Sequence, residues 1–187
     1  MLAGVSRATT ALFDLDGTLV DSDAALMAPF AALGVPRERL PALGLPLGEA
    51  CSHAGVSVED YLERYDDRLV VPFAGVPDML AALDRWAVCS NKAQVSGRAE
   101  LSRLGWQPAL ALFSEDFDGR PKTLEPALTA LELAPEQVVF VGDTAHDRTC
   151  AADARVRFAL AGWNPRASAE PGDIVLARPA DVLDLIR

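Results

Sequence analysis

Two carboxylates stand two positions apart at the end of a short apolar run near the start of the chain. The run covers residues 10–13 and is typical of a buried strand, and Asp14 and Asp16 follow it. Alternate side chains of an extended backbone point to the same side, so both carboxylates face the same way. Gly17 then lets the chain turn. Two converging carboxylates favour a cation between them, and Mg²⁺ is a hard ion that prefers oxygen ligands.

A strand followed by an ordinary Asp-Gly turn would explain that stretch alone, but further polar groups follow later apolar runs or precede a helix. In chain order they are Ser90, Asn91 and Lys92, then Lys122, and then Asp143 with Asp147 one helical turn further on. In a parallel sheet, ligands bind beyond the carboxyl ends of the strands. We therefore expect all these groups to meet the first two carboxylates in one crevice.

The predicted crevice contains the groups that phosphoryl transfer requires. Asp14 can attack phosphorus and become an aspartyl-phosphate. Asp16 can protonate the leaving oxygen and later take a proton from water. Ser90 can donate a hydrogen bond to a phosphoryl oxygen, and we assign Asn91 and Gly17 to the same phosphate-binding region.

A lysine and a metal ion would neutralise negative charge in this crevice. Lys122 would supply a positive charge to the phosphoryl group and the nucleophile. Asp143 would complete the metal site, and Asp147 would steady Lys122 or a metal-bound water. We expect Mg²⁺ as the cofactor. Lys92 is interpreted as a solvated residue or a neighbour of the phosphate site.

From residue 73 onward the sequence alternates helical patterns with short apolar runs. The predicted strands cover residues 86–90, 110–114, 137–142, 156–161 and 174–177, and the predicted helices cover 77–85, 94–104, 123–133, 146–154 and 180–186. Strands that are apolar throughout and separated by helices indicate a parallel sheet covered on both faces. The fold class is therefore α/β.

The segment between the first strand and this alternation has a different pattern. Helices are predicted at about residues 22–33, 48–54 and 58–70, and a stretch rich in proline and glycine, residues 34–46, separates the first two. Residues 22–72 thus form a predicted all-helical insert. The main body would comprise residues 1–21 and 73–187.

Charge and cysteine usage restrict the partners and the compartment. A formal net charge of −10 over 187 residues argues against nucleic acid or an anionic membrane as a partner. The three cysteines are odd in number and form no C-x-x-C pair, which indicates free thiols in a reducing compartment. No apolar run approaches the roughly 20 residues of a membrane span, and no signal-peptide pattern is seen. We expect a cytoplasmic protein.

The ordered set of polar groups resembles the haloacid dehalogenase superfamily of phosphohydrolases, in particular its phosphoglycolate-phosphatase-like branch. Residues 14–18 (Asp-Leu-Asp-Gly-Thr) are similar to the family's first motif, residues 90–92 to its second, Lys122 to its third and residues 142–147 to its fourth. The similarity extends over essentially the whole chain.

The resemblance implies a Rossmann-like three-layer α/β/α core with a small helical cap at residues 22–72, and Mg²⁺-dependent hydrolysis of a small phosphate monoester. It also implies that the backbone carbonyl of Asp16 is a metal ligand beside the Asp14 and Asp143 carboxylates.

Some features depart from the family pattern and leave alternatives open. Lys122 is not followed directly by proline, so Arg120 stays a conceivable stand-in. The cap is short, and the substrate is therefore open among phosphoglycolate, sugar phosphates and nucleoside monophosphates. The roles of His53 and His146 are open, as is the choice between a monomer and a homodimer.

Single residues argue against two other activities of the same superfamily. Halide removal needs no acid at the position of Asp16, so the presence of Asp16 argues against that activity. Phosphonate cleavage would need a lysine in the cap, and no lysine occurs between Asp16 and Lys92. A phosphosugar mutase keeps both acids and is the alternative within the superfamily. A non-catalytic phosphate-binding or metal-binding relative is the alternative of a different class.

Overall fold

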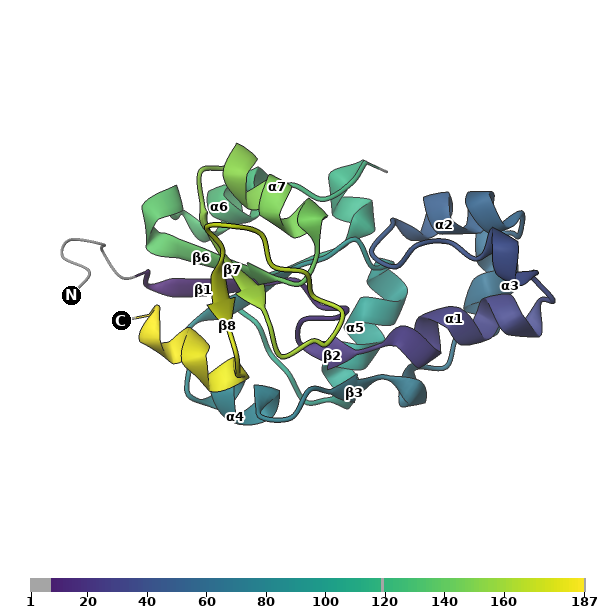
Figure 1. Ribbon diagram of the computed structural model, residues 1–187, viewed down its shortest axis with the longest axis horizontal. Coiled ribbons are helices and arrows are strands. Elements are labelled where there is room, and N and C mark those ends of the chain that lie inside the picture. The colour runs from purple at the N-terminus through teal and green to yellow at the C-terminus, as the bar shows by residue number, and fades with distance from the viewer. Residues whose placement is uncertain (1–7, 119, 187) are drawn as a thin grey trace.

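The computed structural model describes residues 8–118 and 120–186, so residues 1–7 of the predicted main body lie outside the described part. Six parallel strands form one sheet in the order β5-β4-β1-β6-β7-β8 (Figure 1). They are β1 (Thr10–Phe13), β4 (Trp86–Cys89), β5 (Ala111–Leu112), β6 (Val138–Gly142), β7 (Arg157–Ala161) and β8 (Ile174–Leu176). The predicted α/β fold class is confirmed.

Helices cover both faces of this sheet. One face carries α4 (Val76–Ala81), α5 (Gln94–Arg103) and the 3₁₀ helix η5 (Pro179–Asp184), and the other carries α6 (Glu125–Leu131) and α7 (Ala145–Asp153). Short 3₁₀ turns, η3 (Ser114–Phe117) and η4 (Pro135–Gln137), precede α6 and β6. The segment at 180–186, predicted as a helix, begins with the 3₁₀ helix η5 instead of an α-helix.

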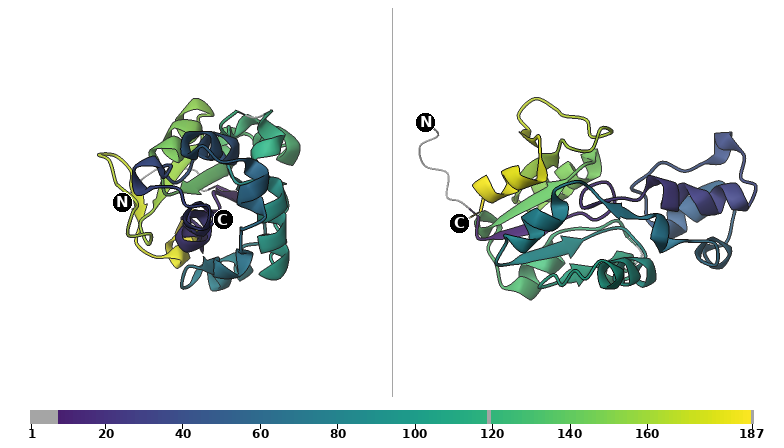
Figure 2. Two further views of the ribbon diagram at one scale, coloured as in Figure 1. Left: turned by 90° about the vertical axis from the view of Figure 1, so that its right-hand side faces the viewer. Right: turned by 90° about the horizontal axis from the view of Figure 1, so that it is seen from below.

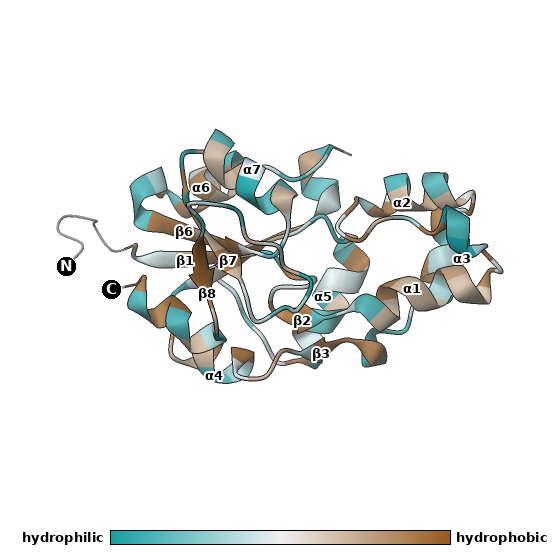
Figure 3. Cartoon of the chain, viewed as in Figure 1, coloured by the Kyte–Doolittle hydropathy of each residue, from teal (hydrophilic) through white to brown (hydrophobic). Residues whose placement is uncertain are grey.

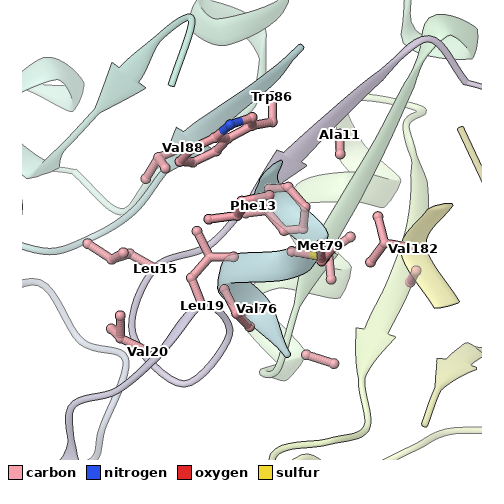
Figure 4. Packing of buried hydrophobic residues seen from close by; sticks show 14 of the residues in the cluster. Ala11, Phe13, Leu15, Leu19, Val20, Val76, Met79, Trp86, Val88 and Val182 are labelled. Carbon is pink, nitrogen blue, oxygen red and sulfur yellow. The ribbon is translucent and has the colours of Figure 1, made fainter. Parts of the chain in front are cut away.

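Alternate residues of β1 enter the two halves of the core. Phe13 packs with Met79 of α4 and meets the Trp86 ring edge to face at a centroid distance of 6.3 Å (Figure 4). Leu12 points to the other half, with Phe140. Because both faces are covered, the central strands β1 and β6 are buried along their whole length. Hydrophobic residues colour β6 and the edge strand β8 brown in Figure 3.

Residues 22–72, called the cap segment below, leave the sheet after β1 and return before α4. Its ends are joined by an antiparallel pair, β2 (Val20–Asp21) with β3 (Val71–Pro72). Between them lie α1 (Asp23–Ala32), η1 (Arg37–Arg39), α2 (Leu47–Ala54), α3 (Val58–Leu62) and η2 (Asp67–Leu69). These helices gather beyond the carboxyl end of β1 (Figure 2), and they share a small core of their own around Phe30 and Tyr61.

The last predicted helix of the cap segment, residues 58–70, is wrong in its length. α3 ends at Leu62, and the chain re-forms as η2, whose start is capped by the Asp66 carboxylate accepting from the Arg68 N–H. Arg103 of α5 binds the carbonyls of Asp67 and Val70 at 2.8 and 2.7 Å. These contacts across the fold outweigh the local helical pattern.

Among residues 8–118 and 120–186, no helix combines the length and the apolar character that crossing a bilayer requires.

Candidate active site

The three central strands bring the predicted site residues to one edge of the sheet. β1 lies between β4 and β6, and Asp14, Ser90 and Asp143 each directly follow the last residue of one of these strands. The Asp14 N–H donates to the Val141 carbonyl at 2.9 Å, which extends the ladder to the first carboxylate. Parallel strand order therefore places residues that are 76 and 53 positions apart next to each other.

Lys122 forms two buried ion pairs at the centre of the site. Its Nζ lies 2.7 Å from a carboxylate oxygen of Asp14 and 2.7 Å from one of Asp147. Burial disfavours charge at Asp147, but the Lys122 ammonium and the hydrogen bonds from Thr144 outweigh it and lower the pKa of this carboxyl. Burial raises the pKa of Asp14 to about 6 even though Lys122 opposes the rise.

Side chains of the core hold the loop that carries Lys122 through hydrogen bonds to its backbone. Asn91 Oδ1 accepts from the Lys122 N–H at 2.7 Å, and Cys150 Sγ donates to the Lys122 carbonyl at 3.1 Å. Cys89 Sγ donates to the next carbonyl, of Thr123, at 3.4 Å. The Arg120 side chain is exposed, whereas Lys122 is buried, so the geometry favours Lys122 for the third-motif position.

Three carboxylates cluster closely enough to share a metal ion. One oxygen each from Asp14, Asp143 and Asp147 lies within 4.8 Å of the others. Burial and the negative charges of Asp14 and Asp147 raise the pKa of Asp143 to about 7. Lys122 pairs with both Asp14 and Asp147, so the three carboxylates share one ammonium group and the cluster keeps an excess of negative charge. Hard oxygens with excess negative charge fit Mg²⁺.

Asp143 is held in place by neutral donors. Thr18 Oγ1 donates to Oδ1 at 3.2 Å, and Asn164 Nδ2 donates to Oδ2 at 2.9 Å. The same amide of Asn164 donates to the Gly17 carbonyl at 2.8 Å. Gly17 has a φ of +79°, and a Cβ there would overlap the Asp143 carboxylate, so both the turn and the close approach require glycine.

A pocket opens between this edge of the sheet and the cap segment. Asp14, Asp16, Ser90, Lys122 and His146 are among the residues that line its core side. Burial and the nearby Lys122 charge lower the pKa of His146, which keeps its imidazole neutral at pH 7. His53 is exposed and does not line this pocket.

Comparison with known proteins identifies the family. The family model described as haloacid dehalogenase-like hydrolase matches residues 11–161. The chain belongs to the haloacid dehalogenase-like hydrolases. The resemblance inferred from the four motifs is thereby confirmed, and the chain is an enzyme of the hydrolase class.

Related haloacid dehalogenase-like hydrolases cover nearly the whole chain. A phosphoglycolate phosphatase of Xylella fastidiosa is 31% identical over 196 residues, which cover 88% of this chain and 85% of the relative. An N-acetylmuramic acid 6-phosphate phosphatase of Pseudomonas aeruginosa is 26% identical over 215 residues, covering 96% and 95%. A solved haloacid dehalogenase-like structure from Streptococcus pneumoniae superposes with a TM-score of 0.75 at 23% identity, covering 95% and 97%.

A second buried charge network of this hydrolase was not expected from its sequence. Lys92 is buried, not solvated, and its Nζ lies 2.8 Å from Asp16 and 3.0 Å from Glu100 of α5. Tyr65 of the cap segment donates to the same Glu100 carboxylate. A lone acid within a helical pattern carries no signal for such a contact, so sequence reasoning missed Glu100.

Asn164 was missed as well, although a signal for it exists. It comes three residues after the last residue of β7, which is the kind of position where the other site residues lie. Gly17, expected near the phosphate, uses its N–H to donate to the Val20 carbonyl at 2.8 Å. The Asn91 side-chain amide donates a hydrogen bond to the Gly44 carbonyl of the cap segment at 3.1 Å.

Proposed function

We propose that this chain hydrolyses phosphate monoesters with the help of Mg²⁺, through an aspartyl-phosphate on Asp14. One observation carries the proposal: the Asp14 carboxylate faces the pocket in contact with Lys122, with Asp143 beside it and Asp16 lining the same pocket. The relatives named as phosphatases support a hydrolase rather than a phosphosugar mutase.

In the first half-reaction, a carboxylate oxygen of Asp14 attacks phosphorus, and the bond from phosphorus to the alcohol oxygen breaks. Asp16 donates a proton to that leaving oxygen. Lys122 and the Ser90 hydroxyl stabilise the charge on the phosphoryl oxygens. Both face the pocket beside the nucleophile.

In the second half-reaction, a water oxygen attacks phosphorus, and the bond between phosphorus and the Asp14 oxygen breaks. Asp16, now deprotonated, takes the proton of the water. Inorganic phosphate leaves, and Asp14 is again a carboxylate. The pair Lys122 and Asp147 keeps a positive charge next to Asp14 in both steps.

Mg²⁺ would be held by Asp14 and Asp143, with the backbone carbonyl of Asp16 as a further ligand, and would neutralise charge on the transferring phosphoryl group. Thr18 and Asn164 orient Asp143 for this purpose. Asp147 would act on Lys122 and not as a principal metal ligand.

We assign residues 22–72 to a cap domain and residues 1–21 with 73–187 to the catalytic core. The β2–β3 pair joins the two ends of the cap segment, and the separate apolar cluster around Phe30 supports the division. The acidic charge favours a small-molecule substrate over nucleic acid. Three free, buried cysteines support a cytoplasmic location.

The test is phosphate release from a panel of phosphate monoesters, in Mg²⁺ and in EDTA. We expect metal-dependent release that Asp14→Asn lowers at least about 10³-fold, because the amide cannot act as the nucleophile. Asp84→Asn makes the same chemical change at an exposed position and should leave the rate unchanged. Wild-type rates in a folded Asp14→Asn protein would refute the mechanism.

A further inference from the structure

The cap segment contributes an apolar wall to the pocket above the reacting carboxylate. Twelve of its residues line the pocket, and none of them carries a charge: Leu26, Met27, Phe30, Pro41, Ala42, Leu43, Gly44, Leu45, Leu47, Ala50, Tyr61 and Tyr65. A phosphate group positioned at Asp14 would direct the alcohol part of an ester toward this wall. The wall therefore lies where the alcohol part of such an ester would bind.

Aromatic rings form a continuous part of this wall. The rings of Phe30 and Tyr61 have a centroid distance of 4.8 Å, and those of Tyr61 and Tyr65 stack at 6.1 Å. Both tyrosine hydroxyls donate within the protein, Tyr61 to the Leu26 carbonyl and Tyr65 to Glu100. With their hydroxyl protons already donated, the tyrosines offer the pocket mainly ring surface.

The charges at the core side of the pocket are already paired. Lys122 contacts two carboxylates and Lys92 contacts two more, so no ammonium group there is free for a second anion. Counting Asp143, the site holds five carboxylates and two ammonium groups, and Asp14 and Asp16 are the carboxylates among them that line the pocket. All of the cap segment is described, and none of its arginines lines this wall.

A neighbouring cavity is lined by two arginines that already contact carboxylates. Arg148 binds Asp173 and Glu170 at 2.7 and 2.9 Å, and Arg166 pairs with Asp23. That cavity also lacks Asp14, Ser90 and Lys122 among its lining residues. The pocket beneath the apolar wall is therefore the place for the alcohol part of a reacting ester.

We propose that the alcohol part of the substrate is uncharged and apolar, an aryl or alkyl group without a second anion. This inference rests on the proposed function and restricts its substrate class. An ionised carboxylate placed against the wall would lose hydration without gaining a cationic partner, which is unfavourable. Phosphoglycolate and N-acetylmuramic acid 6-phosphate both carry such a carboxylate, so the substrates in the relatives' names do not fit this pocket.

The experiment compares esters that differ by one carboxylate. Phenyl phosphate is paired with 4-carboxyphenyl phosphate, and ethyl phosphate with phosphoglycolate, in Mg²⁺ at pH 7.5. We expect kcat/KM to be at least about tenfold higher for the neutral member of each pair. Equal values, or a preference for the carboxylated ester, would overturn the proposal while leaving the phosphatase activity in place.

A charge introduced into the wall tests whether the uncharged wall causes the preference for neutral esters. Met27 lines the pocket and is unbranched, so Met27→Lys keeps the unbranched shape, is one atom longer and adds a cation. We expect the preference for phenyl over 4-carboxyphenyl phosphate to shrink at least about fivefold, because the ammonium would pair with the carboxylate. Ala31→Lys adds the same charge on the exposed side of α1 and should leave the preference unchanged. An unchanged preference in folded Met27→Lys would contradict the assignment of the wall.

A binding measurement separates this proposal from the proposed function. Calorimetric titration in Mg²⁺ with phenylphosphonate and 4-carboxyphenylphosphonate needs no turnover. Binding of the neutral ligand at least about tenfold more tightly supports the proposal, and equal or reversed affinities overturn it. Failure of the folded protein to hydrolyse any ester in the panel would overturn the proposed function instead.

Discussion

Each oxygen of the Asp143 carboxylate accepts from a different neutral donor. Thr18 binds Oδ1 and Asn164 binds Oδ2, and the same Asn164 amide also binds the Gly17 carbonyl. Neutral donors orient a carboxylate without cancelling the charge that a metal needs. Asn164 thus links the turn after Asp16 to the proposed metal ligand.

Removing this donor should weaken the metal site without removing a proposed ligand. We expect Asn164→Ala to weaken the apparent Mg²⁺ affinity about 10-fold to 100-fold, because the carboxylate loses a fixed orientation. The Mg²⁺ dependence of phosphate release and a direct calorimetric titration would measure it. Thr18→Val removes the other donor and should act in the same direction. An unchanged Mg²⁺ affinity in both variants would show that the two donors serve only the fold.

Helix α5 connects the core to the cap segment through successive turns. Gly97 packs on the Phe113 ring, Glu100 reaches Lys92, and Arg103 holds the carbonyls of Asp67 and Val70. The close approach at Gly97 sets the distance of the helix from the sheet. The other two contacts depend on that distance.

The packing at Gly97 predicts an unfavourable substitution in a helix where alanine is otherwise preferred. A Cβ at this position would overlap the Phe113 ring, so Gly97→Ala should lower the free energy of unfolding by about 1–3 kcal/mol. In α2, a Cβ at Gly48 would meet no atom within 4 Å, and Gly48→Ala should raise stability by up to about 1 kcal/mol. Urea unfolding of both variants checks the prediction. Stabilisation by Gly97→Ala would contradict the packing of α5.

On the scale of the whole molecule, a buried polar chain joins the cap segment to the site. It runs from Tyr65 through Glu100 and Lys92 to Asp16. Burial raises the pKa of Glu100 to about 7, against the opposing effect of Lys92. The folded protein therefore retains a proton on Glu100 at pH values where the unfolded chain has released it.

This raised pKa predicts how stability depends on pH. The contribution of Glu100 is complete below the pKa of an unfolded glutamate, about 4.3, and is lost as the pH rises through about 7. Glu100→Gln removes this titration, so its stability relative to wild type should rise between pH 5 and 8, by roughly 1–3 kcal/mol. Urea unfolding in EDTA measures the difference. Glu132→Gln, an exposed control, should show no such trend, and parallel curves for Glu100→Gln and wild type would refute the prediction.

The parts of the fold that the sequence predicted depend on local patterns and on chain direction. Apolar runs identified the strands around Asp14, Ser90 and Asp143, because a strand buried on both faces needs apolar residues at nearly every position. Parallel strands carry their carboxyl ends to one edge, so the position of each residue after its strand was enough to bring them together. Their chemical roles remain predictions.

The family, the α/β core and the convergence of the motif residues could all be predicted from the sequence, because they follow from short-range patterns and residue order. Three features became apparent only in the folded chain: the burial of Lys92 against Glu100, the hydrogen bond from Asn164 to Asp143 and the early end of α3. The tertiary structure also showed that the cap segment covers the site with an uncharged wall. Contacts between residues that are far apart in the chain produce no periodic pattern in the sequence, so they cannot be predicted from it.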